Sequence, residues 1–328
     1  MIRKIVFLLA AFLCGACFSA WAKGRSEAAD RPAAEDQPEM QVAAMKGPTG
    51  IGMIKLFEDA PAPGGGIRAR YTAYSSPDLV VPKMVRGEID IAALPANLAV
   101  NLYNRGAPYR LVGIIGNGVL YLVTTDPDVS SLESLKGKTV QNVARGSTPE
   151  FVARHILEKK GLAKDVDVQF RYAHAELAQL LIAGREASGI LPEPFASKVL
   201  LAKQGSRIAC DFQEEWAALH PARPLYPMTV LVAKASLPGS VLAAFTREYR
   251  KSQDWVTANP GEAGVLAEKF EFGISAADAV TAIPRCNLVF VQAAQARPLL
   301  EEFLSVFLEF APEAIGGKLP DDGFYPAP

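Results

Sequence analysis

The chain has 328 residues, of which 50% are hydrophobic and 21% are charged, and its 34 Lys and Arg nearly balance its 35 Asp and Glu. So many apolar residues with so little net charge exclude a chain that is disordered throughout, and the absence of a basic stripe argues against a nucleic-acid partner. The length predicts two domains or one two-lobed unit.

Residues 1–22 have the pattern of an export signal. Arg3 and Lys4 supply a positive start, and Ile5–Leu13 form an apolar run of nine residues, too short to cross a bilayer. Ala20-Trp21-Ala22 has the order of small residues typical of a cleavage site. We therefore predict cleavage after Ala22 and a periplasmic or other extracytoplasmic location; the alternative is a buried N-terminal helix.

Lipid attachment at Cys17 is the alternative to simple cleavage. Gly15-Ala16 supply the two small residues that precede such a cysteine, but Cys14 stands where a lipid-attachment site carries leucine. Residues 23–40 are polar, contain Ala and Pro and show no periodicity. We therefore predict that they form a disordered tether.

Two cysteines follow further along the chain, Cys210 and Cys286. In an oxidising compartment they either pair or remain two buried free thiols, and the sequence does not give the separation that would decide. No Cys/His spacing is typical of a zinc site, so we predict neither a metal nor a cofactor. No later stretch of eighteen apolar residues suggests a membrane span.

From residue 41 onward, predicted strands and helices alternate. Strands are expected near residues 40–45, 67–74, 89–93, 109–115, 120–124, 139–143, 166–172, 188–191 and 229–234. Helices are expected near residues 51–57, 76–86, 96–103, 150–160, 175–183, 195–204, 241–258 and 299–310. The alternation predicts an α/β fold with largely parallel sheets. The strand–helix–strand unit recurs at 41–93 and 139–191, which predicts two similar lobes.

A first candidate site lies at a strand-to-helix junction, Lys46-Gly47-Pro48-Thr49-Gly50. Free backbone N–H groups at such a junction attract anions or carbonyl oxygens. Thr49 caps the helix or donates its hydroxyl, and Gly47 lets the backbone approach a ligand closely. The residues fit neither a phosphate-binding P-loop nor a dinucleotide fingerprint. The alternative interpretation is a tight turn with a helix cap.

A second junction of the same kind is Arg145-Gly146-Ser147-Thr148-Pro149-Glu150. Ser147 or Thr148 is expected to cap the helix, and Pro149 suits its first turn. Arg145 has a guanidinium that forms forked contacts with an anionic or carbonyl group. The alternative is a well-capped helix beside a solvated arginine. Two such junctions facing each other across a cleft would favour the ligand-binding interpretation.

Two further segments follow predicted strands, where α/β sheets bind ligands. Leu94 and Asn97 come after one strand, and the Asn97 amide both donates and accepts hydrogen bonds. Glu193, between Pro192 and Pro194, holds the corresponding place in the second lobe and could pair with a cationic group. The alternatives are an ordinary helix cap for Asn97 and a solvent-facing carboxylate for Glu193.

Aromatic side chains near these junctions could stack on a ring, although core packing is the alternative for each. They are Tyr74, Tyr121, Phe195 and Tyr226.

Motifs for catalysis are missing. His155, His174 and His220 are scattered without partners at ligand spacing, and neither G-x-S-x-G nor H-E-x-x-H occurs. We therefore predict a protein that is not an enzyme.

Four stretches together carry a family resemblance: KGPTGIGM at 46–53, RGEIDIAALP at 86–95, SLESLKGKTV at 131–140 and ILPEPF at 190–195. In this order the chain, from 41 to 328, resembles the extracytoplasmic solute-binding proteins of ABC transporters. Within them it is most similar to the nitrate, sulfonate and thiamine-precursor group.

The resemblance implies a two-lobed type II periplasmic-binding-protein fold, with a mainly parallel sheet flanked by helices in each lobe and the ligand cleft between them. Lobe one would comprise 41–123 plus 229–328 and lobe two 124–228, with crossings near Leu120–Thr125 and Tyr226–Val232. A monomer would capture a small organic solute by hinge closure and deliver it to a membrane permease. By position, the implied ligand contacts are Gly47, Pro48, Thr49, Tyr74, Leu94, Asn97, Arg145, Ser147, Thr148, Glu193 and Tyr226.

One residue departs from what the nitrate and sulfonate binders require. Pro48 has no N–H to offer an oxyanion, which favours a partly aromatic solute such as a pyrimidine or another vitamin-like ring. Two other functions stay open. The fold also occurs in enzymes resembling those of menaquinone and pyrimidine synthesis, and a sensor module that has lost transport would look the same.

Overall fold

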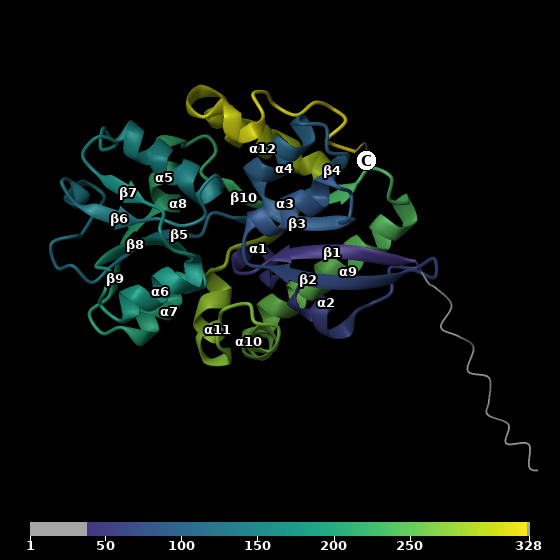
Figure 1. Cartoon of the computed structure of the whole chain (residues 1–328), viewed down its shortest axis with the longest axis horizontal. Helices are drawn as coiled ribbons and strands as arrows, with labels where there is room; N and C mark the ends of the chain where they lie inside the picture. Colours follow the sequence, from purple (N-terminus) through teal and green to yellow (C-terminus); the bar gives the residue numbers. More distant parts are fainter. Residues whose placement is uncertain (1–37, 327–328) are drawn as a thin grey trace, which may run out of the picture. The chain divides into compact units, whose positions relative to one another are not determined.

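The computed structural model describes residues 38–326, so the predicted signal at 1–22, Cys17 and all but the last residues of the predicted tether lie outside the described residues (Figure 1). The described residues belong to one compact unit. None of the helices described combines the length and the apolar character that a bilayer crossing needs.

The first of two sheets has six strands in the order β11-β4-β10-β3-β1-β2. These strands are β1 (Glu39–Met45), β2 (Arg68–Tyr74), β3 (Ile91–Pro95), β4 (Tyr109–Asn117), β10 (Pro227–Lys234) and β11 (Leu288–Gln292). β1 pairs in parallel with β2 and β3. β10 is antiparallel to β3 and β4, and β11 is antiparallel to β4.

The second sheet has five strands in the order β7-β6-β8-β5-β9. These are β5 (Leu120–Thr124), β6 (Thr139–Gln141), β7 (Asp167–Gln169), β8 (Ser188–Pro192) and β9 (Arg207–Asp211). β6 is parallel to β7 and β8, whereas β5 is antiparallel to β8 and β9. In the first sheet β1, β2, β3 and β4 therefore run in one direction and β10 and β11 run against it, whereas in the described part of the second sheet β5 alone runs against the other strands. The prediction of mainly parallel sheets is confirmed, with β5 and β10, which follow the two crossings between the sheets, among the reversed strands.

The crossings lie a few residues from where the sequence suggested. β4 of the first sheet ends at Asn117 and β5 of the second begins at Leu120, so residues 120–123 belong with the second sheet and not with lobe one as predicted. The chain returns to the first sheet at Pro227. Below, the first half means residues 38–117 and 227–326, and the second half means residues 118–226.

Helices cover both faces of the first sheet. The helices of the first half are α1 (Pro48–Ile51), α2 (Ile54–Asp59), α3 (Pro77–Val85), α4 (Ala96–Asn104), α9 (Gly239–Ala258), α10 (Pro260–Lys269), α11 (Ala276–Ala282) and α12 (Ala293–Phe310). Along β1, Ala43 and Met45 pack in one core cluster and Val42 and Ala44 in another. The strand is apolar on both faces because each face is covered, as Figure 1 shows for α3 and α4 on one side and α2 and α9 on the other.

The second half has four helices of its own, α5 (Thr148–Lys159), α6 (His174–Ile182), α7 (Phe195–Ala202) and α8 (Phe212–Leu219). Leu177, Leu181 and Leu191 centre a core beneath α6 and α7. Other apolar side chains join the halves, since the ring of Phe151 on α5 lies 5.4 Å from that of Phe307 on α12. The halves are thus in close contact in this structure.

The two downstream cysteines do not pair. Cys210 and Cys286 are both buried free thiols, which decides between the two alternatives that the sequence left open.

Candidate functional site

Four strand-to-helix junctions meet where the halves face each other. β1 leads into α1 and β3 into α4 in the first half, while β6 leads into α5 and β8 into α7 in the second. They enclose a cavity of about 20 Å³, here called the strand-end cavity. Its lining consists of Met45, Lys46, Pro48, Thr49, Pro95, Ala144, Ser147, Pro149, His174, Pro192, Met228 and Thr229.

Hydroxyl groups are the main polar atoms of this cavity. Ser147 is fully buried, and among the described residues its Oγ has no hydrogen-bond partner. Ser147 stands at the N-cap position of α5 but makes no side-chain cap hydrogen bond, contrary to the predicted capping role. Thr49 and Thr229 add two more buried hydroxyl groups from the first half. A buried hydroxyl without a partner costs free energy, so a ligand that satisfies it gains correspondingly.

One cation and one imidazole complete the polar lining. The Lys46 ammonium lies 3.8 Å from the exposed Glu271 carboxylate. Such a surface pair contributes little to stability, so the Lys46 charge can still attract an anionic ligand. Burial lowers the pKa of His174 to about 4, so this imidazole is neutral at pH 7. A neutral imidazole donates from one nitrogen and accepts at the other.

Asn97 and Thr148, both predicted ligand contacts, instead bond to each other. The Thr148 hydroxyl donates to Asn97 Oδ1 at 3.0 Å, and Asn97 Nδ2 donates to the Gly146 carbonyl at 3.0 Å. Asn97 is on α4 of the first half, whereas Gly146 and Thr148 belong to the second. These bonds therefore join the two halves beside the cavity.

Glu193 has its cationic partner within the chain. Its carboxylate is fully buried, accepts hydrogen bonds from the N–H and Oγ of Ser197 at 3.0 Å each, and lies 2.9 Å from Nε of Arg285. Burial raises the pKa of Glu193, while Ser197 and Arg285 act against that shift. The Arg285 guanidinium also lies 5.1 Å from the ring of Tyr121. The pair therefore joins the two halves.

Three predicted contacts lie away from the cavity lining. Leu94 is fully buried in the core because β3 is covered on both faces. Tyr226 is also in the core, 5.3 Å from the Trp216 ring and 5.9 Å from the Phe303 ring. Arg145 is exposed and its guanidinium lies 5.0 Å over the ring of Phe170.

The remaining predicted contacts lie at or near the cavity. Pro48, Thr49 and Ser147 line it. Gly47 has φ of 91° and sits at the start of α1, where a Cβ would come within 3.3 Å of the Phe195 ring. Tyr74 ends β2 and is half-buried against the core.

Sequence reasoning missed Thr229, Met228 and His174 as lining residues. Thr229 was placed in a strand, and only its antiparallel pairing with Pro95 at the end of β3 brings it to the cavity. In the sequence His174 has no partner at ligand spacing, because the ring that it contacts, Phe195, is distant in sequence and comes close only in the folded chain. The position of His174 at the start of a helix after a strand was the available signal.

A histidine pair lies where α5 and α8 meet α12, and it gives the first prediction. His155 is buried, with Nε2 3.0 Å from Nε2 of His220, and its ring lies 5.2 Å from that of Phe310. Burial, with help from His220 and Lys159, lowers the pKa of His155 to about 4. The unfolded chain therefore binds more protons than the folded one between that pH and the ordinary value near 6.5, so stability falls as the pH falls through this window.

Replacing His155 by phenylalanine should remove part of this acid sensitivity. At pH 4.5 the loss of unfolding free energy relative to pH 7 is expected to be about 2 kcal/mol smaller for His155→Phe than for the wild type. Urea unfolding at the two pH values measures this difference. An equal loss in both proteins would show that His155 does not titrate as inferred.

Comparison with known proteins identifies the family. A family model described as the periplasmic substrate-binding protein of phosphonate ABC transporters matches residues 64–247, more than half of the chain. The chain belongs to this family. Family membership confirms the resemblance seen in the sequence and places the protein outside the cytoplasm.

The chain is also similar to individual proteins. YtlA of Bacillus subtilis (strain 168) is 25% identical over 219 residues, which span 63% of this chain and 63% of YtlA. An ABC transporter protein from Parabacteroides distasonis has 26% identity, a TM-score of 0.74, and a match covering 89% of this chain and 99% of that one. The aliphatic sulphonate binding protein SsuA of Escherichia coli shares the fold, with 17% identity, a TM-score of 0.66, and 86% and 92% of the two chains covered.

Proposed function

We propose that this protein is the substrate-binding component of an ABC importer, which holds a small organic solute in the strand-end cavity and delivers it to a membrane permease without catalysis. The observation that carries the proposal is the fully buried hydroxyl of Ser147, which has no hydrogen-bond partner within residues 38–326 and lies in a cavity lined by both halves. The two halves would serve as the two lobes of the binding protein, with Gly118 and Val119 as one of the links between them.

The lining favours a solute with a phosphonate or sulfonate group. The hydroxyls of Thr49, Ser147 and Thr229 and the ammonium of Lys46 are donors that suit the oxygens of such a group. Pro48 and Pro149 remove two backbone N–H groups, so hydroxyl groups would replace amides as donors. The family description and the name of the E. coli relative point to the same chemistry.

The aromatic ring solute that Pro48 suggested has less support. None of the four aromatic candidates, Tyr74, Tyr121, Phe195 and Tyr226, is among the residues that line the cavity. The lining instead combines proline and methionine side chains with hydroxyl groups. The apolar part would contact a short alkyl group.

The size of the cavity requires movement. A volume of about 20 Å³ holds little more than one water molecule. A solute therefore enters while the halves are apart, and closure forms the Asn97–Thr148 and Glu193–Arg285 contacts. The described structure has the two halves in contact, and the strand-end cavity must widen before it can hold such a solute.

A thermal-shift screen tests the proposal. The panel contains methylphosphonate, ethylphosphonate, ethanesulfonate, taurine, nitrate, thiamine and pyrimidines. A ligand at 100 times its Kd adds about 2.7 kcal/mol of stability, which corresponds to several degrees in Tm. We expect a phosphonate or sulfonate to give the largest shift. A shift with only thiamine or pyrimidines would contradict the solute class. If no compound shifts Tm and mass spectrometry finds no copurified solute, solute binding itself is contradicted.

A further inference from the structure

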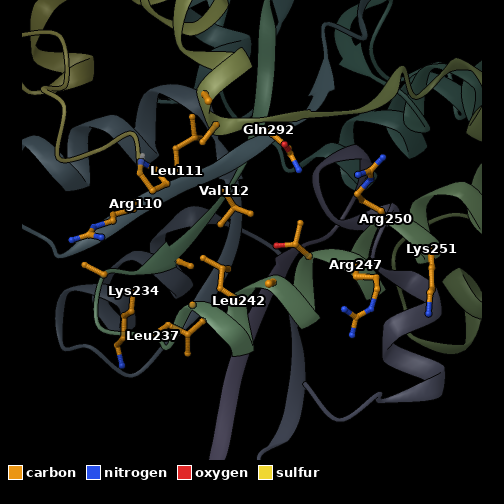
Figure 2. Close-up of a pocket in the computed structure, with 18 of the residues that line it drawn as sticks. Arg110, Leu111, Val112, Lys234, Leu237, Leu242, Arg247, Arg250, Lys251 and Gln292 are labelled. Carbon is orange, nitrogen blue, oxygen red and sulfur yellow. The ribbon is translucent and has the colours of Figure 1, made fainter. Parts of the chain in front are cut away.

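A groove of about 880 Å³ lies on the first half (Figure 2). Five basic side chains line it, and they come from three elements: Arg110 of β4, Lys234 of β10, and Arg247, Arg250 and Lys251 of α9. Asp254 is the one acidic residue of its lining. We propose that this basic groove docks on the phosphate headgroups of anionic phospholipids at the membrane surface.

The strand register separates the groove from the solute cavity. Thr229 of β10 lines the cavity, whereas Lys234 on the same strand lines the groove. Five residues of strand span roughly 17 Å. Arg110 pairs with Ala233 at the same far end of the sheet. The groove and the cavity share no lining residue, so the groove can be occupied independently of the solute.

Two arginines of the groove have charges that no carboxylate of the described chain pairs with. Lys234 is paired with Asp90 at 2.8 Å, and Lys251 lies 3.0 Å and Arg247 3.5 Å from Glu248. Within residues 38–326, Arg110 and Arg250 have no carboxylate within ion-pair distance. Arg250 instead lies 5.6 Å over the ring of Phe290. Both arginines are exposed, so they can meet external phosphate oxygens in the forked geometry that guanidinium groups favour.

The groove also offers apolar surface between its cations. Figure 2 shows Arg110 and Lys234 on one side and Arg247, Arg250 and Lys251 on the other, with aliphatic side chains between them. Leu237 and Leu242 are half-buried there, over the buried Val112. Basic groups around an apolar floor match an amphiphile with a phosphate head better than a free inorganic anion.

The position at which the described chain begins favours a membrane over an acidic protein as the partner. Val42 pairs with Ile91, Ile91 with Ala233, and Ala233 with Arg110, so these residues form one row across the sheet. Glu39, at the start of β1, lies three residues beyond Val42 on the side away from the strand-end cavity. The described chain thus begins at the end of the sheet where the groove lies. Docking there would leave the solute cavity turned away from the lipid.

Vesicle flotation of the full chain tests the proposal. One set of vesicles is pure phosphatidylcholine and the other contains 30% phosphatidylglycerol. We expect binding to the anionic vesicles alone, weakened by salt. The double variant Arg110→Gln/Arg250→Gln should lower the partition coefficient about 30-fold, from about 1 kcal/mol for each basic residue at the surface. Its thermal midpoint and its solute binding should match the wild type.

The matched control is Lys164→Gln/Arg185→Gln, which removes two exposed cations of the second half and should leave vesicle binding unchanged. Equal binding by the groove variant and the wild type would overturn the proposal, as would wild-type binding to neither vesicle. Release from the vesicles by inorganic phosphate, beyond that by NaCl of equal ionic strength, would assign the groove to a soluble phosphate. Retention on immobilised polyglutamate without vesicle binding would assign it to an acidic protein. Either result would overturn membrane docking.

Discussion

Replacing Arg285 by alanine is expected to lower the unfolding free energy by about 3 kcal/mol at pH 7.5, because it leaves the fully buried carboxylate of Glu193 without its cation. We take the lower end of the range for broken buried pairs because the Arg285 side chain is 34% exposed and solvent screens part of its charge. The two hydrogen bonds from Ser197 remain and still stabilise the charge in part.

The loss of unfolding free energy in Arg285→Ala should depend on pH. Burial already raises the pKa of Glu193, and loss of the guanidinium raises it further. For an acid whose folded pKa lies above its unfolded pKa, the stabilising effect is present below the unfolded value and disappears as the pH rises through the folded value. The difference between variant and wild type should therefore be smaller at pH 4.5 than at pH 7.5.

Urea unfolding at the two pH values measures this prediction. Glu193→Gln/Arg285→Ala should recover part of the stability at pH 7.5, since a neutral amide needs no cation. Lys269→Ala breaks the exposed pair with Glu58 and is the matched control, with an expected cost below about 1 kcal/mol. A cost of Arg285→Ala that is equal at both pH values would mean that Glu193 is not the group that Arg285 stabilises.

Replacing Gly118 by alanine should destabilise the protein by about 3 kcal/mol or more, through overpacking at the link between β4 and β5. A Cβ at this position would lie 2.1 Å from Cζ of Tyr226 and 2.4 Å from its Cε1. The Tyr226 ring cannot move aside easily, because it is buried between the rings of Trp216 and Phe303. The extra methyl group therefore forces the two crossings between the sheets apart.

Thermal and urea unfolding of Gly118→Ala measure the effect. Gly239→Ala, in the first turn of α9, is the matched control because a Cβ there has no atom within 4 Å. This control should be neutral or slightly more stable, since alanine favours a helix over glycine. Wild-type stability of Gly118→Ala would mean that the Tyr226 ring does not occupy the space against the link.

Local patterns predicted the βαβ part of the fold well. The apolar run of β1 and the turn residues after β1 and β6 gave both the strands and the junctions that form the cavity. The reversed strands could not be predicted, since the direction of β10 depends on where the chain returns from the second sheet. Period and propensity are the same for parallel and antiparallel strands when both faces are buried.

Partners distant in sequence limited the prediction of the site. Ser147 and Thr49 were found because their junctions attract ligands in any α/β sheet. The roles of Asn97 and Glu193 could not be assigned from the sequence. The Asn97 side-chain oxygen accepts a hydrogen bond from Thr148, and the Glu193 carboxylate pairs with Arg285, and each partner comes from the opposite half. Tyr226 was misplaced for a similar reason: the sequence shows an aromatic residue beside a crossing, but not the Trp216 and Phe303 rings that enclose it.

Calorimetric titration of Ser147→Ala with the solute found in the screen tests the central claim most directly. We predict that affinity falls about 10-fold or more, since a hydrogen bond to a charged oxygen contributes about 1.5–3 kcal/mol. The unfolding free energy of the free protein should stay level or rise, because the hydroxyl has no partner among the residues that the structure describes and makes no cap bond. Ser305→Ala, whose hydroxyl donates to the Glu301 carbonyl on α12, is the control and should bind like the wild type. Unchanged affinity in Ser147→Ala would contradict a solute site in the strand-end cavity.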